Sequence, residues 1–579
     1  MLRRLGWFGV AGLIANCGGE SHVADRRGPE ATAGHANASG VAGRAGTAGC
    51  PACEAGRAAA GGDAARGGTA GAAASDAGAG DAGAAEAGAR AERGGRSGVG
   101  GSDGATNAGE AGEGGAPSAG ASEGGAAGTS NVPKDGLSVG KVAVYQAVEV
   151  TLRDGTDTAL NAPIVAQREA LVRVWLAPGT EWTARNVEAE LVIGNGVNSR
   201  TAASVLEVSA ASIDFDLGST FTFTLRASEV TDTTTLSIVL RDAADASALG
   251  RWPTAGPYAL VTSSSKGPFV VTLVPIVANG LSPDVGAQTL ARFERYLSHV
   301  YPASSVDMTV RPTPVRLDVA LTADGGGWDD ALDALYAARE SDQPAPNTYY
   351  YGVLTPGSSM NAYCGSDCVV GLSTVAGRTE EGYRGAIGTG FFESNGDTFS
   401  QETMAHELGH ALGREHAPCG HPDSVDPKYP YASGQIGVYG YDGRNLLDRD
   451  DYKDEMTYCV PVWISDYTWS GIFSRISYVN GLAQKRVATN GAAAPRSRIL
   501  ALAAGGLHWG RERTSASAAE GELAELELLD ARGALLDVLS VPFARFDHLP
   551  GGFLSVPSDV LARADVASVR AGGVVLAVP

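Results

Sequence analysis

The chain has 579 residues, which is enough for several domains, and its 44 basic and 65 acidic side chains give a formal net charge of −21. This acidic balance excludes nucleic acid as a partner, because nucleic acid binds to a basic surface. Acidic charge suits an exported, soluble protein and carries no information on its substrate.

The first residues predict export. Residues 1–4 carry two arginines, and residues 5–15 are an apolar run that is too short to span a bilayer and is typical of a signal peptide. The stretch that ends at Cys17 resembles a bacterial lipobox, although Asn16 stands where a small residue is usual. The resemblance implies a signal peptide at residues 1–17 and a lipid on Cys17, which makes the protein a lipoprotein of the bacterial cell envelope. Secretion without a lipid is the alternative, and we expect no other contact with a membrane.

Residues 18–136 form a low-complexity segment that is rich in Gly, Ala, Ser and charged side chains. Such a composition buries too little apolar surface to offset the entropy lost on ordering the chain. Cys50 and Cys53 within it have the spacing of a metal or redox pair, but a local disulfide or no role is the simpler interpretation. We predict a disordered Gly/Ala-rich linker that tethers the domains behind it.

Residues 137–265 predict a β-sandwich. Short alternations of Val, Leu and Thr recur, as in residues 170–176 and 235–240, and turns rich in Gly, Asn or Asp separate them. No cluster of chemically reactive side chains occurs in this segment. We therefore expect an accessory domain.

Residues 266–481 alternate strand and helix patterns, which predicts an α/β domain. We expect strands at residues 269–277, 306–310 and 349–354, and helices up to Val300 and at residues 328–339. A further helix is expected to begin near Ser400. The last helix, at residues 465–479, is expected to stop at Asn480 and Gly481.

A metal-binding pattern lies on the helix expected after Ser400. His406 and His410 are four residues apart, so they lie one turn apart on one helix face and can bind one Zn²⁺. Glu407 stands beside them, where it can act on a metal-bound water. Gly413 can adopt the left-handed conformation that ends a helix and lets the chain bring in His416 as a third ligand. Three protein ligands leave one open position, which is typical of a catalytic zinc site.

The whole stretch, H-E-x-x-H-x-x-G-x-x-H, resembles that of the metzincins, a family of zinc endopeptidases. The resemblance implies a methionine turn beneath the metal, and Met456 is the one methionine downstream of the histidines. It also implies a role for Tyr458, whose phenol would bind the resting metal and stabilise the oxyanion during reaction. A core methionine and a packing tyrosine are the plain alternatives for these two residues.

The resemblance has further consequences for residues 266–481. It implies that the glycine-rich strands between residues 372 and 392 hold the edge strand to which an extended peptide substrate pairs. It also brings Cys419 and Cys459 to the same site, which makes a disulfide between them natural. Cys364 and Cys368 are close enough in sequence to bridge a loop, and both bridges fit an oxidising compartment.

Residues 482–579 return to strand patterns, at residues 523–528, 535–541 and 573–578, and predict a small C-terminal β domain. His508 and His548 are isolated there and receive no role. The predicted fold class is therefore an α/β metzincin-like catalytic domain between two β-sandwich domains, with a disordered tether in front.

The predicted function is that of an exported, monomeric zinc endopeptidase that hydrolyses proteins. Some secreted bacterial metzincins with flanking β domains act on glycoproteins, and the sequence leaves open whether this protein does. Its cofactor would be Zn²⁺ on His406, His410 and His416, with Glu407 as the general base. Two alternatives are a zinc amidase that acts on cell wall and a catalytically silent, metzincin-like adhesin. The presence of Glu407 beside all three histidines disfavours the adhesin, because binding alone does not need a base.

Overall fold

The computed structural model describes residues 134–196, 198–365, 368–392, 398–486, 496–503, 506–514 and 522–579. The predicted signal peptide, Cys17 and almost all of the predicted tether lie outside these residues. Most of the regular structure in the described part is β-sheet, arranged in several separate sheets. Among the helices of the described part, none combines the length and the apolar character needed to cross a bilayer.

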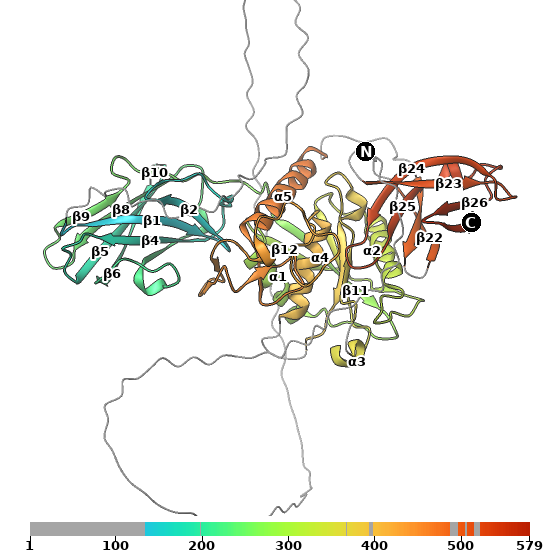
Figure 1. Cartoon of the computed structure of the whole chain (residues 1–579), viewed down its shortest axis with the longest axis horizontal. Helices are drawn as coiled ribbons and strands as arrows, with labels where there is room; N and C mark the ends of the chain where they lie inside the picture. The colour runs from blue at the N-terminus through green and yellow to red at the C-terminus, as the bar shows by residue number, and fades with distance from the viewer. Residues whose placement is uncertain are drawn as a thin grey trace, which may run out of the picture. The chain divides into compact units, whose positions relative to one another are not determined.

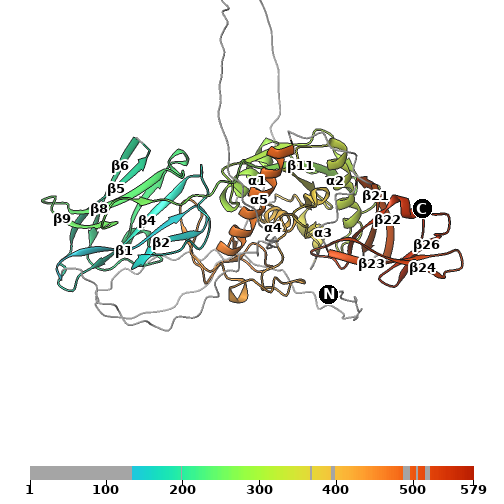
Figure 2. The ribbon, with the colours of Figure 1, turned by 90° about the horizontal axis from the view of Figure 1, so that it is seen from above.

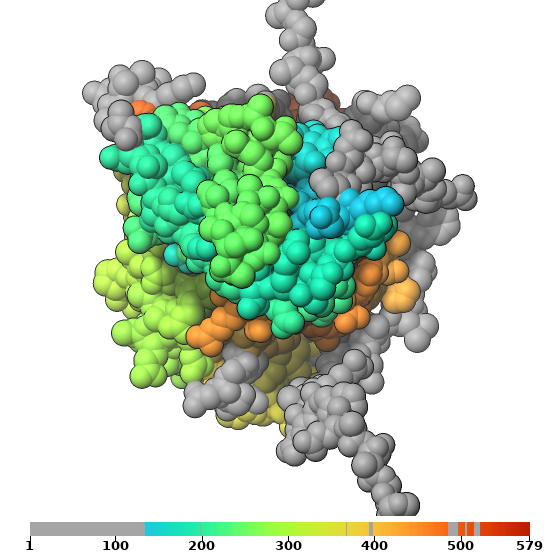
Figure 3. Space-filling model, turned by 90° about the vertical axis from the view of Figure 1, so that its left-hand side faces the viewer, coloured from blue at the N-terminus to red at the C-terminus, as the bar shows by residue number. Residues whose placement is uncertain are grey.

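Two five-stranded sheets follow first along the chain, in the order β3-β2-β1-β4-β7 and β10-β8-β5-β6 with β9 on β8. Alternate residues of their strands are buried, as in β8, so one face of each sheet contributes to a shared apolar core. This agrees with the predicted sandwich (Figure 1), whose outer surface Figure 3 shows in space-filling form. The strands are β1 (Leu137–Tyr145), β2 (Glu149–Asp154), β3 (Thr156–Asp157), β4 (Ala170–Pro178), β5 (Arg185–Asn195), β6 (Asn198–Val208), β7 (Phe221–Leu225), β8 (Thr234–Asp242), β9 (Ala248–Trp252) and β10 (Tyr258–Ala259), with the short 3-10 helices η1 (Leu217–Ser219) and η2 (Ala227–Glu229).

The next sheet has the order β12-β11-β14-β16-β15, with β13 also on β11. All pairs in it are parallel except that of β15 with β16, which is antiparallel. The predicted strands at residues 269–277 and 306–310 are confirmed. The strands are β11 (Phe269–Val277), β12 (Val306–Val310), β13 (Val315–Arg316), β14 (Thr348–Leu354), β15 (Gly371–Ser373) and β16 (Gly385–Thr389), and the 3-10 helix η3 (Glu381–Tyr383) precedes β16.

Helices cover both faces of this sheet (Figure 1). Alternate residues of β11 point to two cores: Val271 packs in the core that contains Phe293 and Leu408, and Ile276 packs in the core that contains Leu332. Because both faces are covered, β14 is buried at every position. The helices are α1 (Ala287–Val300), α2 (Trp328–Asp342), α3 (Met360–Cys364), α4 (Phe399–Ala411) and α5 (Asp466–Arg486).

Helix α5 differs from the prediction at its end. It packs in the same core as α1 and α4 (Figure 2) and continues to Arg486, so the stop predicted at Asn480 and Gly481 is wrong. The reason lies in the side chain of Asn480, which is buried and donates to the carbonyl oxygens of Ser265 and Pro268 at 2.9 and 3.1 Å. An asparagine that bonds to a neighbouring segment does not end its own helix.

Between α4 and α5 the chain forms mostly loops. Its regular pieces are η4 (Ala432–Gly434), β17 (Gly440–Tyr441), β18 (Leu446–Leu447), β19 (Lys453–Asp454) and β20 (Val462–Trp463). The indole of Trp463 donates to the carbonyl oxygen of Ala147 at 2.9 Å, so this stretch is bonded to the first pair of sheets.

The C-terminal strands form one seven-stranded sheet in the order β22-β21-β25-β24-β23-β26-β27. The predicted β domain is present, but the prediction that it is a sandwich of two sheets is wrong, because a single sheet surrounds its own apolar core. The sheet curls so that its two edge strands approach each other. The indole of Trp509 on one edge strand donates to the carbonyl oxygen of Ala577 on the other at 2.7 Å. Its elements are β21 (Arg496–Ala503), β22 (Gly506–Thr514), β23 (Glu522–Leu529), β24 (Leu535–Arg545), β25 (Gly552–Pro557), α6 (Ser558–Leu561), β26 (Ser568–Ala571) and β27 (Val574–Ala577).

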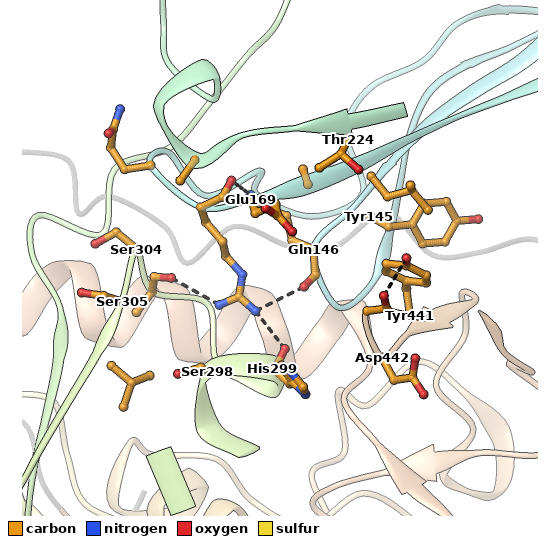
Figure 4. A pocket seen from close by; sticks show the side chains of 18 residues that line it. Tyr145, Gln146, Glu169, Thr224, Ser298, His299, Ser304, Ser305, Tyr441 and Asp442 are labelled. Atoms are coloured by element: carbon orange, nitrogen blue, oxygen red, sulfur yellow. Dashed lines mark hydrogen bonds between the residues drawn. The ribbon is translucent and has the colours of Figure 1, made fainter. Parts of the chain in front are cut away.

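A cavity of about 480 Å³ lies between the first pair of sheets and α1 (Figure 4). Gln146 and His299 line it from the two sides, and the buried guanidinium of Arg168 donates to the carbonyl oxygens of both, at 3.2 and 2.8 Å. It donates to the carbonyl oxygen of Tyr301 as well. None of the residues that line this cavity is a predicted metal ligand. We therefore infer a structural role for Arg168, which connects α1 to the first pair of sheets.

Candidate metal centre

The three predicted metal ligands are positioned by α4 and by the turn that ends it. His406 and His410 lie one turn apart on a helix that is buried almost all round, so their side chains cannot turn to solvent. Gly413 adopts the left-handed conformation (φ +80°), and the amides of Gly413 and Arg414 donate to the carbonyl oxygens of His410 and Gly409. This turn sends the chain back towards the helix.

Gly413 has no room for a side chain. A Cβ there would lie 2.2 Å from the guanidinium of Arg475 and 3.0 Å from the carbonyl oxygen of Ala376. The predicted role of Gly413 is thus confirmed in its backbone conformation, and His416 follows it into the same cluster.

The Nε2 atoms of the three histidines face one another. His410 Nε2 lies 3.1 Å from that of His406 and 3.2 Å from that of His416. Each Nδ1 lies 2.6–2.7 Å from a backbone carbonyl oxygen, that of Glu455, Arg414 and Asp423 respectively. A carbonyl oxygen only accepts, so each Nδ1 carries the proton and each Nε2 presents a lone pair.

This arrangement fits a metal ion. Three lone pairs at these distances cannot bond to one another, and a cation between them would satisfy all three. Carbonyl oxygens that fix the tautomer of a histidine ring are typical of metal sites. The residues that would hold the metal are therefore His406, His410 and His416, each buried to more than nine-tenths.

The pKa values of the three imidazoles also favour metal binding. Burial is the largest cause of a lowered pKa at all three: it lowers the pKa of His410 to about 4 and that of His416 to about 2, and it places the pKa of His406 well below its usual value. The charges of neighbouring imidazoles add to this effect at His406 and His416. All three rings are thus neutral at pH 7, as metal binding requires.

Met456 lies beneath α4, where the methionine turn was predicted. A Cβ on Gly409 would lie 2.5 Å from the Met456 sulfur, so the helix packs directly on the methionine. The turn is fixed by the buried carboxylate of Asp454, which accepts from the Met456 and Ser465 amides at 2.9 and 3.0 Å. The Met456 carbonyl oxygen accepts from the amide of Ala417 at 2.9 Å, which joins the turn to the end of the helix.

Both predicted disulfides are present in the structure. Cys419 and Cys459 are bonded, with 5.7 Å between their Cα atoms, and connect the loop after His416 to the methionine turn. Cys364 and Cys368 close a short loop after α3.

Glu407 is only 1% exposed and lies against the edge strand of the sheet. A Cβ on Gly371 in β15 would lie 2.2 Å from its Oε1, so a glycine is needed there. Burial raises the pKa of Glu407 well above its usual value, and the nearby charge of Asp547 raises it further. Gly371 could not be singled out before the structure was known, because a single glycine in a glycine-rich strand has many explanations.

His548, to which no role was assigned, lies in this site. Its interpretation as an isolated residue is therefore wrong. Its Nε2 is 2.8 Å from Glu407 Oε1, and its Nδ1 is 2.5 Å from the hydroxyl of Tyr458. Asp547 beside it is fully buried, with an oxygen 3.5 Å from His410 Nε2. Both residues come from the turn between β24 and β25. The sequence shows a turn there, in Pro550 and the glycines after it, but not where the turn packs.

Tyr458 lies beside the histidines, with its ring centre 5.0 Å from that of His416. Its hydroxyl is bonded to His548. His508 lies elsewhere, with its Nε2 3.2 Å from a carboxylate oxygen of Asp329 on α2.

Comparison with known families gives a partial match. A family described as Peptidase M66 matches residues 357–449, which contain Glu407 and the three histidines but neither Met456 nor His548. No curated protein matches the chain. Solved structures that match include a β-glucuronidase of Bacteroides uniformis, with a TM-score of 0.16, and Bacteroides uniformis β-glucuronidase 2 covalently bound to cyclophellitol-6-carboxylate aziridine, with a TM-score of 0.15. Each is 10% identical over 38% of this chain and 29% of its own, and likenesses this low carry no argument. The family match supports a metallopeptidase.

Proposed function

We propose that this protein is a zinc endopeptidase of the metzincin type. The observation that carries the proposal is the convergence of three Nε2 lone pairs beside the buried carboxylate of Glu407. Three neutral imidazoles suit zinc and leave one position for water and substrate. The match to Peptidase M66 supports hydrolysis of peptide bonds.

A zinc ion held by these histidines would supply a bound water of lowered pKa and would polarise the carbonyl of the scissile bond. Glu407 accepts the proton of the attacking water and passes it to the departing amine. The raised pKa of Glu407, which its burial causes, suits a group that must carry a proton near neutral pH. Tyr458, whose ring lies beside that of His416, would donate a hydrogen bond to the developing oxyanion.

The substrate would bind as an extended peptide. β15 is the last strand of its sheet, and Gly371 within it lies over Glu407. A peptide that adds antiparallel to this edge would run across the metal, with its backbone bonded to the strand. Recognition through the backbone favours an endopeptidase, because such pairing does not need a chain end.

We also propose that the protein works outside the cytoplasm, with a lipid on Cys17. The two disulfides support an oxidising compartment. Cys17→Ala should move the protein from the membrane fraction to the soluble fraction, and an unchanged distribution would rule out the anchor.

Glu407→Gln tests the reaction itself. We expect it to lower the rate of cleavage of an unfolded protein by about 10²–10⁴-fold, because the proton carrier is lost, and to leave the zinc content unchanged. Glu402→Gln is the matched control, since Glu402 lies on the same helix one turn before the site. Digestion fragments identified by mass spectrometry distinguish a peptidase from a cell-wall amidase and from an adhesin, neither of which would cut the protein. Cleavage by Glu407→Gln at the wild-type rate would contradict the mechanism.

A further inference from the structure

The turn between β24 and β25 lies against the end of the edge strand β15 and the two residues that follow it. We call residues 546–551 the closing turn. At its start, the amide of Val375 donates to the carbonyl oxygen of Arg545 at 3.1 Å, and Thr374 and Phe546 form an antiparallel bridge. The amide of Ser373 donates to the Asp547 carboxylate at 3.0 Å. The segment therefore continues the sheet beyond β15, as an added peptide strand would.

The closing turn is anchored by buried contacts. Phe546 is 2% exposed, and its ring meets that of Phe553 edge to face with 4.8 Å between ring centres. Both rings share a core with Leu372 of the edge strand. The Asp547 carboxylate also accepts from the amide of His548 at 2.7 Å. These contacts fix the backbone that carries the His548 ring, which is itself 17% exposed in its side chain.

The ring of His548 stands where a fourth ligand of a tetrahedral site would stand. Its centre lies 5.1, 5.7 and 5.3 Å from the ring centres of the three predicted ligands in chain order. The distances among those three rings are 4.8, 5.3 and 4.5 Å, so the four rings surround one point almost evenly. One nitrogen from each of the four rings lies within 4.8 Å of the other three.

Both ring nitrogens of His548 are bonded in this structure: its Nδ1 lies 2.5 Å from the hydroxyl of Tyr458, and its Nε2 lies 2.8 Å from Oε1 of Glu407. A phenol hydroxyl both donates and accepts, so Nδ1 can donate to it. The Nε2 then presents a lone pair to the metal once its bond to Glu407 is given up. Asp547 is the other acidic or basic group of the turn near the site. Its carboxylate accepts from the amides of Ser373 and His548, and one of its oxygens lies 3.5 Å from His410 Nε2.

We propose that His548 is a fourth protein ligand of the metal, delivered by the C-terminal sheet in the place that water and substrate need. A zinc ion with four protein ligands is typical of a structural site, whereas a catalytic zinc keeps one position open. The protein is thus latent in this conformation, and His548 must leave the metal before a substrate binds. This inference rests on the proposed function, because the same metal serves both.

Release of zinc to a coloured chelator tests the fourth ligand without measuring activity. We expect zinc-loaded, full-length His548→Ala to release the metal at least about tenfold faster than the wild type, because one of four ligands is gone. His548→Gln keeps a polar side chain of similar size and should also release faster, which separates the lost ligand from a disturbed turn. His508→Ala, a histidine of the same sheet outside the site, is the control and should match the wild type.

Substitution of zinc by Co²⁺ gives a second measurement. The visible absorption of the Co²⁺ protein should change in His548→Ala, because water replaces a nitrogen ligand, and should stay unchanged in His508→Ala. Identical spectra and identical release rates for wild type and His548→Ala would overturn the inference.

Cleavage of a short peptide separates this inference from the proposed function. We expect His548→Ala to cleave it at least about tenfold faster than the wild type, since the open position is restored. Slower cleavage with unchanged zinc release would mean that His548 acts on the substrate, and the inference would fail while the peptidase stands. Faster zinc release with no cleavage by any variant would establish the fourth ligand and refute the peptidase.

Discussion

Helix α4 and the closing turn reach the same site by different routes. His406 and His410 come together because four residues make one helical turn, and His416 follows through a glycine turn six residues on. His548 meets Glu407 across a separation of 141 residues, and it comes from a different sheet of the molecule. The residues that would hold the metal are thus encoded by their spacing along a short stretch of sequence. The group that closes the site is encoded by the packing of one sheet edge on another.

The largest effect is expected from the loss of a metal ligand on α4. His410 is the histidine whose Nε2 lies within 3.2 Å of both other Nε2 atoms. His410→Ala should therefore reduce the zinc content from about one ion per chain to almost none after dialysis, as measured by atomic emission. His508→Ala should keep its zinc. A His410→Ala protein that still holds one zinc ion per chain would show that the metal binds elsewhere.

A smaller effect is expected from a substitution in the edge strand β15 beside Glu407. Gly371→Ala places a methyl group 2.2 Å from Glu407 Oε1, so the carboxylate must move. A displacement of about 1 Å can cost about 100-fold in rate, and we expect a loss of that order in peptide cleavage with the zinc content unchanged. Gly382→Ala is the control, because a Cβ there meets nothing within 4 Å. Equal cleavage rates for the two variants would mean that the base is not held by the strand.

The smallest expected effect is a pH dependence of the metal-free protein. The folded chain keeps its buried histidines neutral, with the pKa of His416 at about 2, whereas the unfolded chain protonates them below about pH 6.5. The unfolded state then binds more protons, so the free energy of unfolding falls as the pH drops below 6.5. His416→Ala removes one such group, and its fall between pH 7 and pH 5 should be smaller by roughly 1–2 kcal/mol in urea unfolding. An equal fall in both proteins would contradict the burial argument.

The parts of the fold and site that could be predicted depend on short-range rules. The strand at residues 269–277 follows from its apolar run, and the turn at Gly413 follows from the need for a left-handed residue before His416. The pairing of Cys419 with Cys459 followed once both were placed near the metal.

The parts that could not be predicted depend on long-range contacts. α5 continues past Asn480 because that side chain bonds to residues more than 200 positions earlier. Gly371 is needed because Glu407 packs on it, and His548 enters the site because Phe546 is buried against the edge strand. No pattern within a single segment contains this information.

The most direct test of the account is the cleavage of an unfolded protein by zinc-loaded His548→Ala, with and without Glu407→Gln added. Opening the site and then removing the base tests the metal centre, the mechanism and the closing turn in one assay. The account predicts that His548→Ala cleaves at least about tenfold faster than the wild type and that adding Glu407→Gln lowers this rate by about 10²–10⁴-fold. Equal rates for the single and the double variant would contradict it.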